Sequence, residues 1–372
     1  MIASRKALAP LALALLGIAA NGLLALANRG SWNVDFSISY AAGKLAGSGH
    51  LYDPAKILPL ELTWSGKAFP FGRIPAYAFA LKPLAALPFP LARALWLGLS
   101  LAAVAGFVAL WPLGSRPWAM TALCWSAPLA MCLAFGQDSV LFLFFVTVGV
   151  RLLLQGRRFS AGLAFSLCVI KPHLALLLPV VLLARREWRA LAGGLAGGLA
   201  LAAASFAVEG PGWPAALRAL TRRPDFDPAA DRMPNLRGLL SLAGGGLGLE
   251  IALGLAVVAA IWFLSRRLPL PEVFALALAG GLLLGHHAYV YDALLLLPAL
   301  LLAFQKTRPE WMRLWALVLL TPLPYLLFLT VWEWPAHLAV TGYTVALVAA
   351  MTIAEIGQRR PRRPPPRPAE LR

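Results

Sequence analysis

The sequence predicts an all-α, polytopic membrane protein with about twelve membrane-crossing helices and little soluble structure. Of its 372 residues, 60% are hydrophobic and only 13% are charged, and the mean hydropathy is +0.74. A soluble protein of this length carries roughly a quarter charged residues. Apolar runs such as 8–27, 95–111 and 190–208 have the length that a bilayer span requires. These observations exclude a water-soluble protein.

The net charge of +17 is distributed in a way that argues against nucleic acid as a partner. A basic excess is common in nucleic-acid-binding proteins, but here the basic residues lie in short clusters between apolar runs. That pattern is typical of cytoplasmic loops in membrane proteins. We therefore expect a lipid bilayer as the environment and no nucleic-acid partner. The clusters are Arg157–Arg158, Arg185–Arg186 with Arg189, Arg266–Arg267, and Lys306 with Arg308 and Arg313.

Twelve segments are predicted to cross the membrane, an even number that places both chain ends in the cytoplasm. The first apolar run, about 20 residues long, exceeds the core of a signal peptide and is predicted to be an uncleaved span. Residues 74–90 contain four prolines, which break helical hydrogen bonding, and are predicted to be interfacial or re-entrant. The predicted spans are 7–27, 92–112, 118–135, 139–154, 160–170, 174–184, 190–208, 248–264, 272–286, 292–304, 312–330 and 336–356.

This arrangement divides the chain into a membrane domain, residues 1–357, and a Pro- and Arg-rich tail, residues 358–372, which is predicted to be disordered and cytoplasmic. Two long loops, 28–73 and 209–246, fall on the outer side. The polar residues that break the apolar pattern at the ends of spans gather on that same side. Such polar groups at membrane depth usually mark function, and we therefore expect a single site on the outer face.

Asp35 follows the first span and precedes an amphipathic stretch, which is predicted to be an interfacial helix that is ended by Gly47–Gly49 and Tyr52-Asp53-Pro54. As an N-cap, its carboxylate would accept backbone N–H bonds at the helix start. As a general base, it would take a proton from a substrate hydroxyl at the membrane surface. Spacing alone leaves both roles open.

Lys171-Pro172-His173 interrupts an apolar stretch, as the turn of a shallow hairpin formed by the short runs 160–170 and 174–184. A lysine there either extends to the interface or binds a phosphate. The cluster from His286 to Asp292 is interpreted as a hydrogen-bonded network or a binding site for substrate phosphate or sugar hydroxyls. A metal site is disfavoured, because no further spaced ligands are present. The polar side chains of Gln137, Asp138 and Asn235 are either helix caps or partners of sugar hydroxyls.

The order of these motifs resembles glycosyltransferase family 87. The segments Asp35-Phe36, Tyr40-Ala41-Ala42 and Leu51-Tyr52-Asp53-Pro54 are similar to the family's first outer loop. The remaining motifs resemble, in order, its Gly-Gln turn, Lys-Pro hairpin, Asn-containing loop and His…Tyr-Asp segment. They are Phe135-Gly136-Gln137-Asp138, Ile170-Lys171-Pro172-His173, Pro234-Asn235-Leu236-Arg237-Gly238 and His287-Ala288-Tyr289-Val290-Tyr291-Asp292.

The resemblance implies a GT-C-type fold and a hexosyltransferase, with mannose as the expected sugar. The donor would be a polyprenyl-phosphate sugar, the acceptor a glycolipid or glycan, and the site would face outward from a bacterial cell (inner) membrane. Asp35 would be the base for inverting attack on the anomeric carbon. No metal or other cofactor is expected, because the donor carries a single phosphate. The implied donor-phosphate ligands are Lys171, His173, His287 and Arg237, and the implied substrate-binding residues are Tyr40, Gln137, Asp138, Asn235, Tyr291 and Asp292.

Other functions remain compatible with the sequence. A transporter or flippase of lipid-linked sugars would explain many spans with polar groups, but it predicts inverted repeats, and none is evident. A scaffold subunit of an envelope assembly would depend on no single carboxylate. A different lipid-linked transferase is the closest alternative within the same fold.

Overall fold

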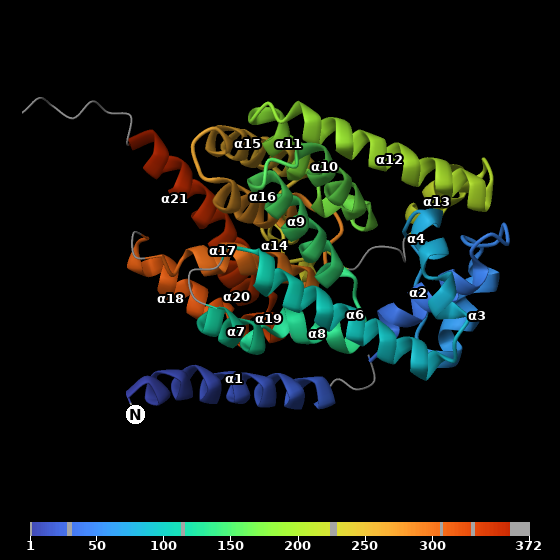
Figure 1. The fold of residues 1–372 in the computed structure, drawn as a ribbon, viewed down its shortest axis with the longest axis horizontal. Coiled ribbons are helices and arrows are strands. Elements are labelled where there is room, and N and C mark those ends of the chain that lie inside the picture. Colours follow the sequence, from blue (N-terminus) through green and yellow to red (C-terminus); the bar gives the residue numbers. More distant parts are fainter. Residues whose placement is uncertain are drawn as a thin grey trace, which may run out of the picture.

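A computed structural model of the chain describes residues 2–27, 32–112, 116–223, 229–305, 308–328 and 332–357. The predicted tail, residues 358–372, and Lys306 of the basic clusters lie outside these ranges. Within them the chain forms helices and connecting loops and no strand, which confirms the all-α prediction. The helices divide into a small unit, here called the cap, and a larger apolar unit, here called the body (Figure 1).

The cap comprises residues 34–85 and one helix from the second long loop, and it lies at one end of the molecule (Figure 1). It has its own hydrophobic core, to which Ile38, Leu51, Phe71 and Leu220 contribute. The small core excludes water from helices that would each be too short to persist alone. Its helices are α2 (Val34–Leu45), α3 (Pro54–Ser65), α4 (Pro75–Ala80), α5 (Lys82–Ala85) and α13 (Trp213–Thr221).

The interfacial helix predicted after Asp35 is present as α2, but α3 was not predicted. Its start carries a recognisable signal, since Asp53 accepts a hydrogen bond from the Ala55 N–H (3.0 Å) and Pro54 occupies the first turn. Asp followed by Pro is a favoured beginning of a helix. In the prediction, Tyr52-Asp53-Pro54 instead marked the end of the preceding helix.

The body contains the remaining elements. Its N-terminal half consists of α1 (Ile2–Ala27), α6 (Phe89–Leu110), α7 (Arg116–Trp125), α8 (Ala127–Phe135), α9 (Ser139–Leu154), α10 (Arg158–Ser166), η2 (Leu167–Ile170), η3 (Pro172–Leu174), α11 (Leu177–Ala184) and α12 (Trp188–Glu209). Its C-terminal half consists of η4 (Ala230–Arg232), α14 (Leu236–Leu242), α15 (Leu247–Ser265), α16 (Leu270–Leu284), η5 (Val290–Leu296), α17 (Leu297–Leu302), α18 (Glu310–Leu319), α19 (Leu323–Leu327), α20 (Glu333–His337), η6 (Leu338–Gly342) and α21 (Tyr343–Gly357).

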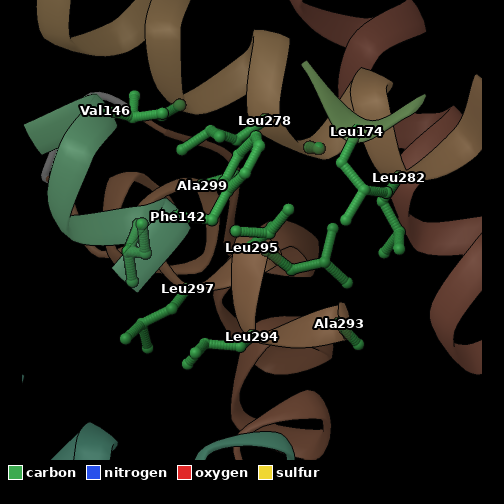
Figure 2. Packing of buried hydrophobic residues seen from close by; sticks show 14 of the residues in the cluster. Phe142, Val146, Leu174, Leu278, Leu282, Ala293, Leu294, Leu295, Leu297 and Ala299 are labelled. Carbon is green, nitrogen blue, oxygen red and sulfur yellow. The ribbon is translucent and has the colours of Figure 1, made fainter. Parts of the chain in front are cut away.

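Helix α16 forms the centre of the body, because every residue from Val273 to Leu283 is buried. A helix that is apolar on all sides is stable only when other apolar segments surround it. Figure 2 shows this packing, with Leu278 and Leu282 of α16 among side chains from α9, η3 and η5. The peripheral helices α1 and α12, in contrast, carry exposed leucines along their length, as helices facing lipid do.

Each of the twelve predicted spans coincides with one or more helices, but not all of these are long enough to cross a bilayer. Within the described residues, five helical segments have the required length and hydropathy, and a sixth arises if the bent pair α7 and α8 is one span. Several others, such as α9 and α16, have only 16 and 15 residues. The structure thus supports a multi-pass membrane protein, whereas the number twelve stays a prediction. The segment 74–90 contains the short helices α4 and α5, and its last two residues begin α6.

Candidate active site

A cavity of about 570 Å³ lies where the cap meets the body. The cap contributes the first turn of α2, the segment 66–73 and part of α13, and the body contributes three loops. Several residues that the sequence placed in one site therefore share one cavity, although they are far apart in the chain. The predicted residues that line it are Asp35, Gln137, Lys171, His173, His287, Tyr291 and Asp292.

Asp35 is the second residue of α2 and does not cap it. The N-cap position belongs to Asn33, whose backbone is left-handed (φ 63°) and whose side-chain oxygen accepts a hydrogen bond from Arg93. The Asp35 carboxylate instead lines the cavity and is hydrogen-bonded to Gln137. Burial raises the pKa of Asp35 to about 7, although the charges of Lys171 and Arg73 oppose this rise. A carboxylate with such a pKa can accept a proton near neutral pH.

Two cations and two carboxylates form a chain of charges beside Asp35. The Arg73 guanidinium donates to Asp138 through Nε (2.6 Å to Oδ2) and Nη2 (3.0 Å to Oδ1). The Lys171 ammonium lies 2.6 Å from Asp292 Oδ1 and 3.6 Å from Asp138 Oδ1. Ser139 joins this chain, since its hydroxyl accepts from Lys171 (2.8 Å) and donates to Asp292 (2.6 Å). The four charges cancel, as buried charges must if they are to remain ionised.

A sharp turn places Gln137 beside Asp35. Helix α8 ends at Gly136, where φ is 79°, and the N–H groups of Gly136 and Gln137 both bond to the Cys132 carbonyl (2.9 and 2.8 Å). This left-handed C-cap favours glycine. A Cβ at position 136 would also collide with the side chain of Phe36 in α2. Glycine is thus required both for the turn and for the close approach of α2.

The loop that carries Lys171 rests on α16. Proline restricts the preceding residue to extended backbone, and Lys171 accordingly departs from the helical region (φ −140°, ψ 72°) between η2 and η3. The chain then packs Leu174 against α16 at Gly281, where a Cβ would collide with the Leu174 carbonyl. The predicted Lys-Pro turn is therefore present, and a glycine in the central helix makes room for it.

Three imidazoles gather on the body side of the cavity. The ring centres of His286 and His287 lie 5.8 and 5.7 Å from that of His173. Burial lowers the pKa of His173 to about 3, so its ring is neutral at physiological pH. In the part of the chain that the structure describes, the His173 Nε2 atom is buried without a hydrogen-bond partner, and no group of His, Cys, Asp or Glu has the geometry to hold a metal ion. The arrangement is suited to hydrogen bonding with a polar ligand.

Two predicted site residues lie outside the cavity and hold the loop that carries His286 and His287. Asn235 is buried at the N-cap of α14, where its Oδ1 accepts from the Gly238 N–H (2.8 Å) and its amide donates to the Gly285 carbonyl. Arg237 donates through Nη1 to the His286 carbonyl (3.0 Å). Asn235 thus supports the loop rather than lining the cavity, and direct contact of either residue with substrate stays a prediction.

Tyr40 does not line the cavity either. Its hydroxyl donates to the Leu87 carbonyl (2.5 Å), and its ring packs edge-on against Trp64 and Phe89. The observed contacts are those of a residue that joins α2 to the start of α6. A substrate-binding role for Tyr40 is still untested.

Sequence reasoning missed two polar residues of the charge chain, Arg73 and Ser139. Arg73 lies in a segment without secondary structure, and its carboxylate partner Asp138 is 65 residues away. No local pattern relates the two. Ser139 follows Asp138 directly and was taken as the beginning of an apolar span.

Of the comparisons with known proteins, one gives a match. The model of glycosyltransferase family 87 matches residues 75–298, which is well over half of the chain. The matched range contains the charge-bearing body loops at Asp138, Lys171 and Asp292, and it begins after Asp35 and the segment 66–73. No curated protein and no solved structure matches the chain. Because the family model covers most of the chain, the protein belongs to glycosyltransferase family 87.

Proposed function

We propose that this membrane glycosyltransferase moves a hexose, with mannose as the first candidate, from a polyprenyl-phosphate donor to an acceptor hydroxyl. The acceptor is a glycolipid or glycan, and transfer takes place on the outer face of the cell membrane with inversion at the anomeric carbon. Family membership supports sugar transfer, and the apolar helices support a multi-pass membrane protein. Together they favour a lipid-linked donor that reaches the cavity from the bilayer.

The observation that carries the proposal is Asp35 in the cavity wall with a pKa raised to about 7. In the proposed step, its carboxylate removes the proton of the acceptor hydroxyl, and the oxygen attacks the anomeric carbon. The bond between that carbon and the phosphate oxygen breaks, and polyprenyl phosphate leaves with the electron pair. General base catalysis of this kind accelerates reactions by roughly 10²–10⁴-fold.

The body side of the cavity is suited to the leaving phosphate. His173 is neutral, with its Nε2 directed at no protein partner among the described residues, and His286 and His287 lie beside it. A neutral imidazole donates a hydrogen bond to a phosphate oxygen from its N–H. Lys171 adds positive potential, although Asp292 and Asp138 already compensate its charge. Fixed donors and charges that face a developing anion lower the transition-state energy without reorganisation.

The test is transfer by the purified protein in liposomes. Radiolabelled polyprenyl-phosphate mannose and the corresponding glucose donor are each supplied with a lipid and glycan extract of membranes. Wild type is compared with Asp35→Asn and with a matched control, Asp53→Asn, which makes the same chemical change in the same loop. Asp53 caps α3 and does not line the cavity. Thermal unfolding in detergent establishes that all three proteins are folded.

Labelled product from wild type and Asp53→Asn, with at least a 100-fold loss for Asp35→Asn, is the expected result. Equal product from all three proteins would retain the transferase and remove Asp35 as its base. Absence of product, with labelled donor crossing the bilayer, would contradict the proposal and indicate a transporter of lipid-linked sugars.

A further inference from the structure

The cap wall of the cavity is a segment without regular secondary structure, residues 66–73. Lys67, Phe69 and Arg73 all contribute to the cavity surface, as do Pro70 and Gly72. Backbone that is neither helix nor strand keeps its shape only if other groups satisfy its hydrogen bonds. The groups that hold this segment therefore determine the shape of the cavity beside Asp35.

Four contacts anchor the segment at alternate residues. The Ser65 hydroxyl donates to the Lys67 carbonyl (2.6 Å), and the Tyr52 hydroxyl donates to the Arg73 carbonyl (2.6 Å). Phe71 is completely buried in the cap core. The remaining anchor is the Glu61 carboxyl of α3, whose Oε2 accepts from the Phe69 N–H at 2.7 Å.

Glu61 is the unusual member of this set. Its side chain has no exposed surface, and its Oε1 is buried without a hydrogen-bond partner among the described residues. The pKa of Glu61 is raised to about 8, mainly because its carboxyl is buried. The nearby charge of Asp35 contributes to the rise. A buried acid with an unsatisfied oxygen lowers stability. Packing alone therefore does not explain a glutamate at this position.

The same corner is hydrogen-bonded to the helix turn that carries Asp35. The Ser37 hydroxyl oxygen lies 2.7 Å from the Val34 carbonyl and 3.0 Å from the Ser65 hydroxyl. Ser65 in turn contacts the Glu61 carbonyl (3.2 Å) as well as the segment itself. A continuous polar connection thus joins the first turn of α2, the end of α3 and the cavity wall.

We propose that Glu61 is a positioning residue, which fixes residues 66–73 beside Asp35 so that Phe69 presents its ring to a sugar acceptor. The Phe69 side chain is 41% exposed although it lines the cavity, and its own N–H is the group that Glu61 holds. An exposed aromatic ring near a base offers an apolar surface to the carbon face of a sugar. The inference rests on the proposed function for the identity of the acceptor, but not for the structural role of Glu61.

Two substitutions separate this role from simple packing. Glu61→Gln keeps a side-chain oxygen for the Phe69 N–H, whereas Glu61→Leu removes the acceptor and leaves an apolar side chain of similar size, which a buried site tolerates. Hydrogen–deuterium exchange of the full-length protein in detergent reports on the Phe69 amide without any substrate. Transfer assays then give kcat and KM for donor and acceptor separately, and thermal unfolding tests the overall fold.

We expect Glu61→Leu to remain folded, to lose exchange protection over residues 66–73, and to lower kcat/KM for the acceptor by about 10- to 100-fold while KM for the donor is unchanged. Glu61→Gln should restore protection and most of the acceptor kcat/KM. Unchanged protection in Glu61→Leu would overturn the proposal, and so would lost protection with unchanged acceptor kinetics. If wild type transfers no sugar, the proposed function fails, and the exchange measurement alone decides whether Glu61 holds the segment.

Discussion

The cap and the body meet at one cavity, and they hold their acidic side chains in opposite ways. In the body, Asp138 and Asp292 are almost completely buried and each lies against a cation. In the cap, Asp35 and Glu61 are carboxyls for which the described residues supply no ion-pair partner, and burial raises their pKa values to about 7 and 8. The body therefore provides fixed charge, and the cap provides acids that change protonation near neutral pH.

This difference suits the ion-paired carboxylates of the body to a structural role and the carboxyls of the cap to proton transfer. A compensated ion pair keeps its charge and shape over a wide pH range, which suits a wall that must bind the same ligand repeatedly. A carboxyl with a raised pKa exchanges its proton readily and suits a base. Arg73 joins the two regions, because it comes from the cap segment and pairs with Asp138 of the body.

The largest effect on stability is expected when one partner of the Arg73–Asp138 ion pair is removed. Asp138→Leu would leave the Arg73 guanidinium and part of the Lys171 charge without compensation, and such a loss costs about 3–5 kcal/mol of unfolding free energy. The double variant Arg73→Met/Asp138→Leu removes one positive and one negative charge, and it should recover most of the stability that Asp138→Leu loses. Thermal or denaturant unfolding in detergent measures both.

The matched control for this prediction is the ion pair of the exposed Arg158 with the half-buried Glu187, at 3.1 Å. Because this pair is less buried than the Asp138 pair, Glu187→Leu should cost less, about 1 kcal/mol. Equal losses for Asp138→Leu and Glu187→Leu would show that the buried charge chain contributes no more to stability than this more exposed pair. The distinction between the two regions would then have no energetic basis.

A second prediction concerns the pH dependence of Asp35. Its folded pKa of about 7 exceeds the ordinary value of 3.8, so folding is favoured while the group is protonated and that contribution is lost as pH rises from about 4 to 7. Asp35→Asn should therefore raise the unfolding free energy at pH 8, by up to about 4 kcal/mol for a shift of this size. At pH 4 the variant and wild type should be alike.

The rate of transfer should change in the opposite direction to stability. The base must be unprotonated, so kcat/KM should fall about tenfold for each pH unit below 7. Glu61→Gln serves as the control, since it should keep this limb of the profile. A rate independent of pH between 5 and 8, or an Asp35→Asn variant less stable than wild type at pH 8, would contradict the assignment of Asp35 as the titrating base.

Much of the fold follows from the sequence because apolar length and proline positions are local properties. The twelve predicted segments all coincide with helices, and α2 begins where the amphipathic pattern after the first span predicts it. The number of spans was harder to predict, because central helices such as α16 and most of α9 are buried in protein. For such helices hydropathy does not distinguish burial in protein from burial in lipid.

The site was predictable to the extent that its residues interrupt apolar runs. Asp35, Gln137, Lys171, His173 and Asp292 were found in this way, and they line one cavity. Arg73 was not, since a basic residue in a polar loop is unremarkable until its partner Asp138 is known. Glu61 was missed for a related reason, because nothing local indicates that its face of α3 is turned inward. Long-range pairing and burial are properties of the tertiary structure.

The smallest expected effect is that of removing a single hydroxyl group from Tyr40 or from Tyr52, two tyrosines whose hydrogen bonds are chemically alike. The Tyr40 hydroxyl donates to the Leu87 carbonyl, and the Tyr52 hydroxyl donates to the Arg73 carbonyl in the cavity wall. Each Tyr→Phe substitution should lower the unfolding free energy by about 1 kcal/mol. Only Tyr52→Phe should also lower kcat/KM for the acceptor, by about three- to tenfold, because it loosens residues 66–73. A greater kinetic loss for Tyr40→Phe would favour the substrate-binding role that the family resemblance implies, and it would place the reactive surface of the cap on α2 alone.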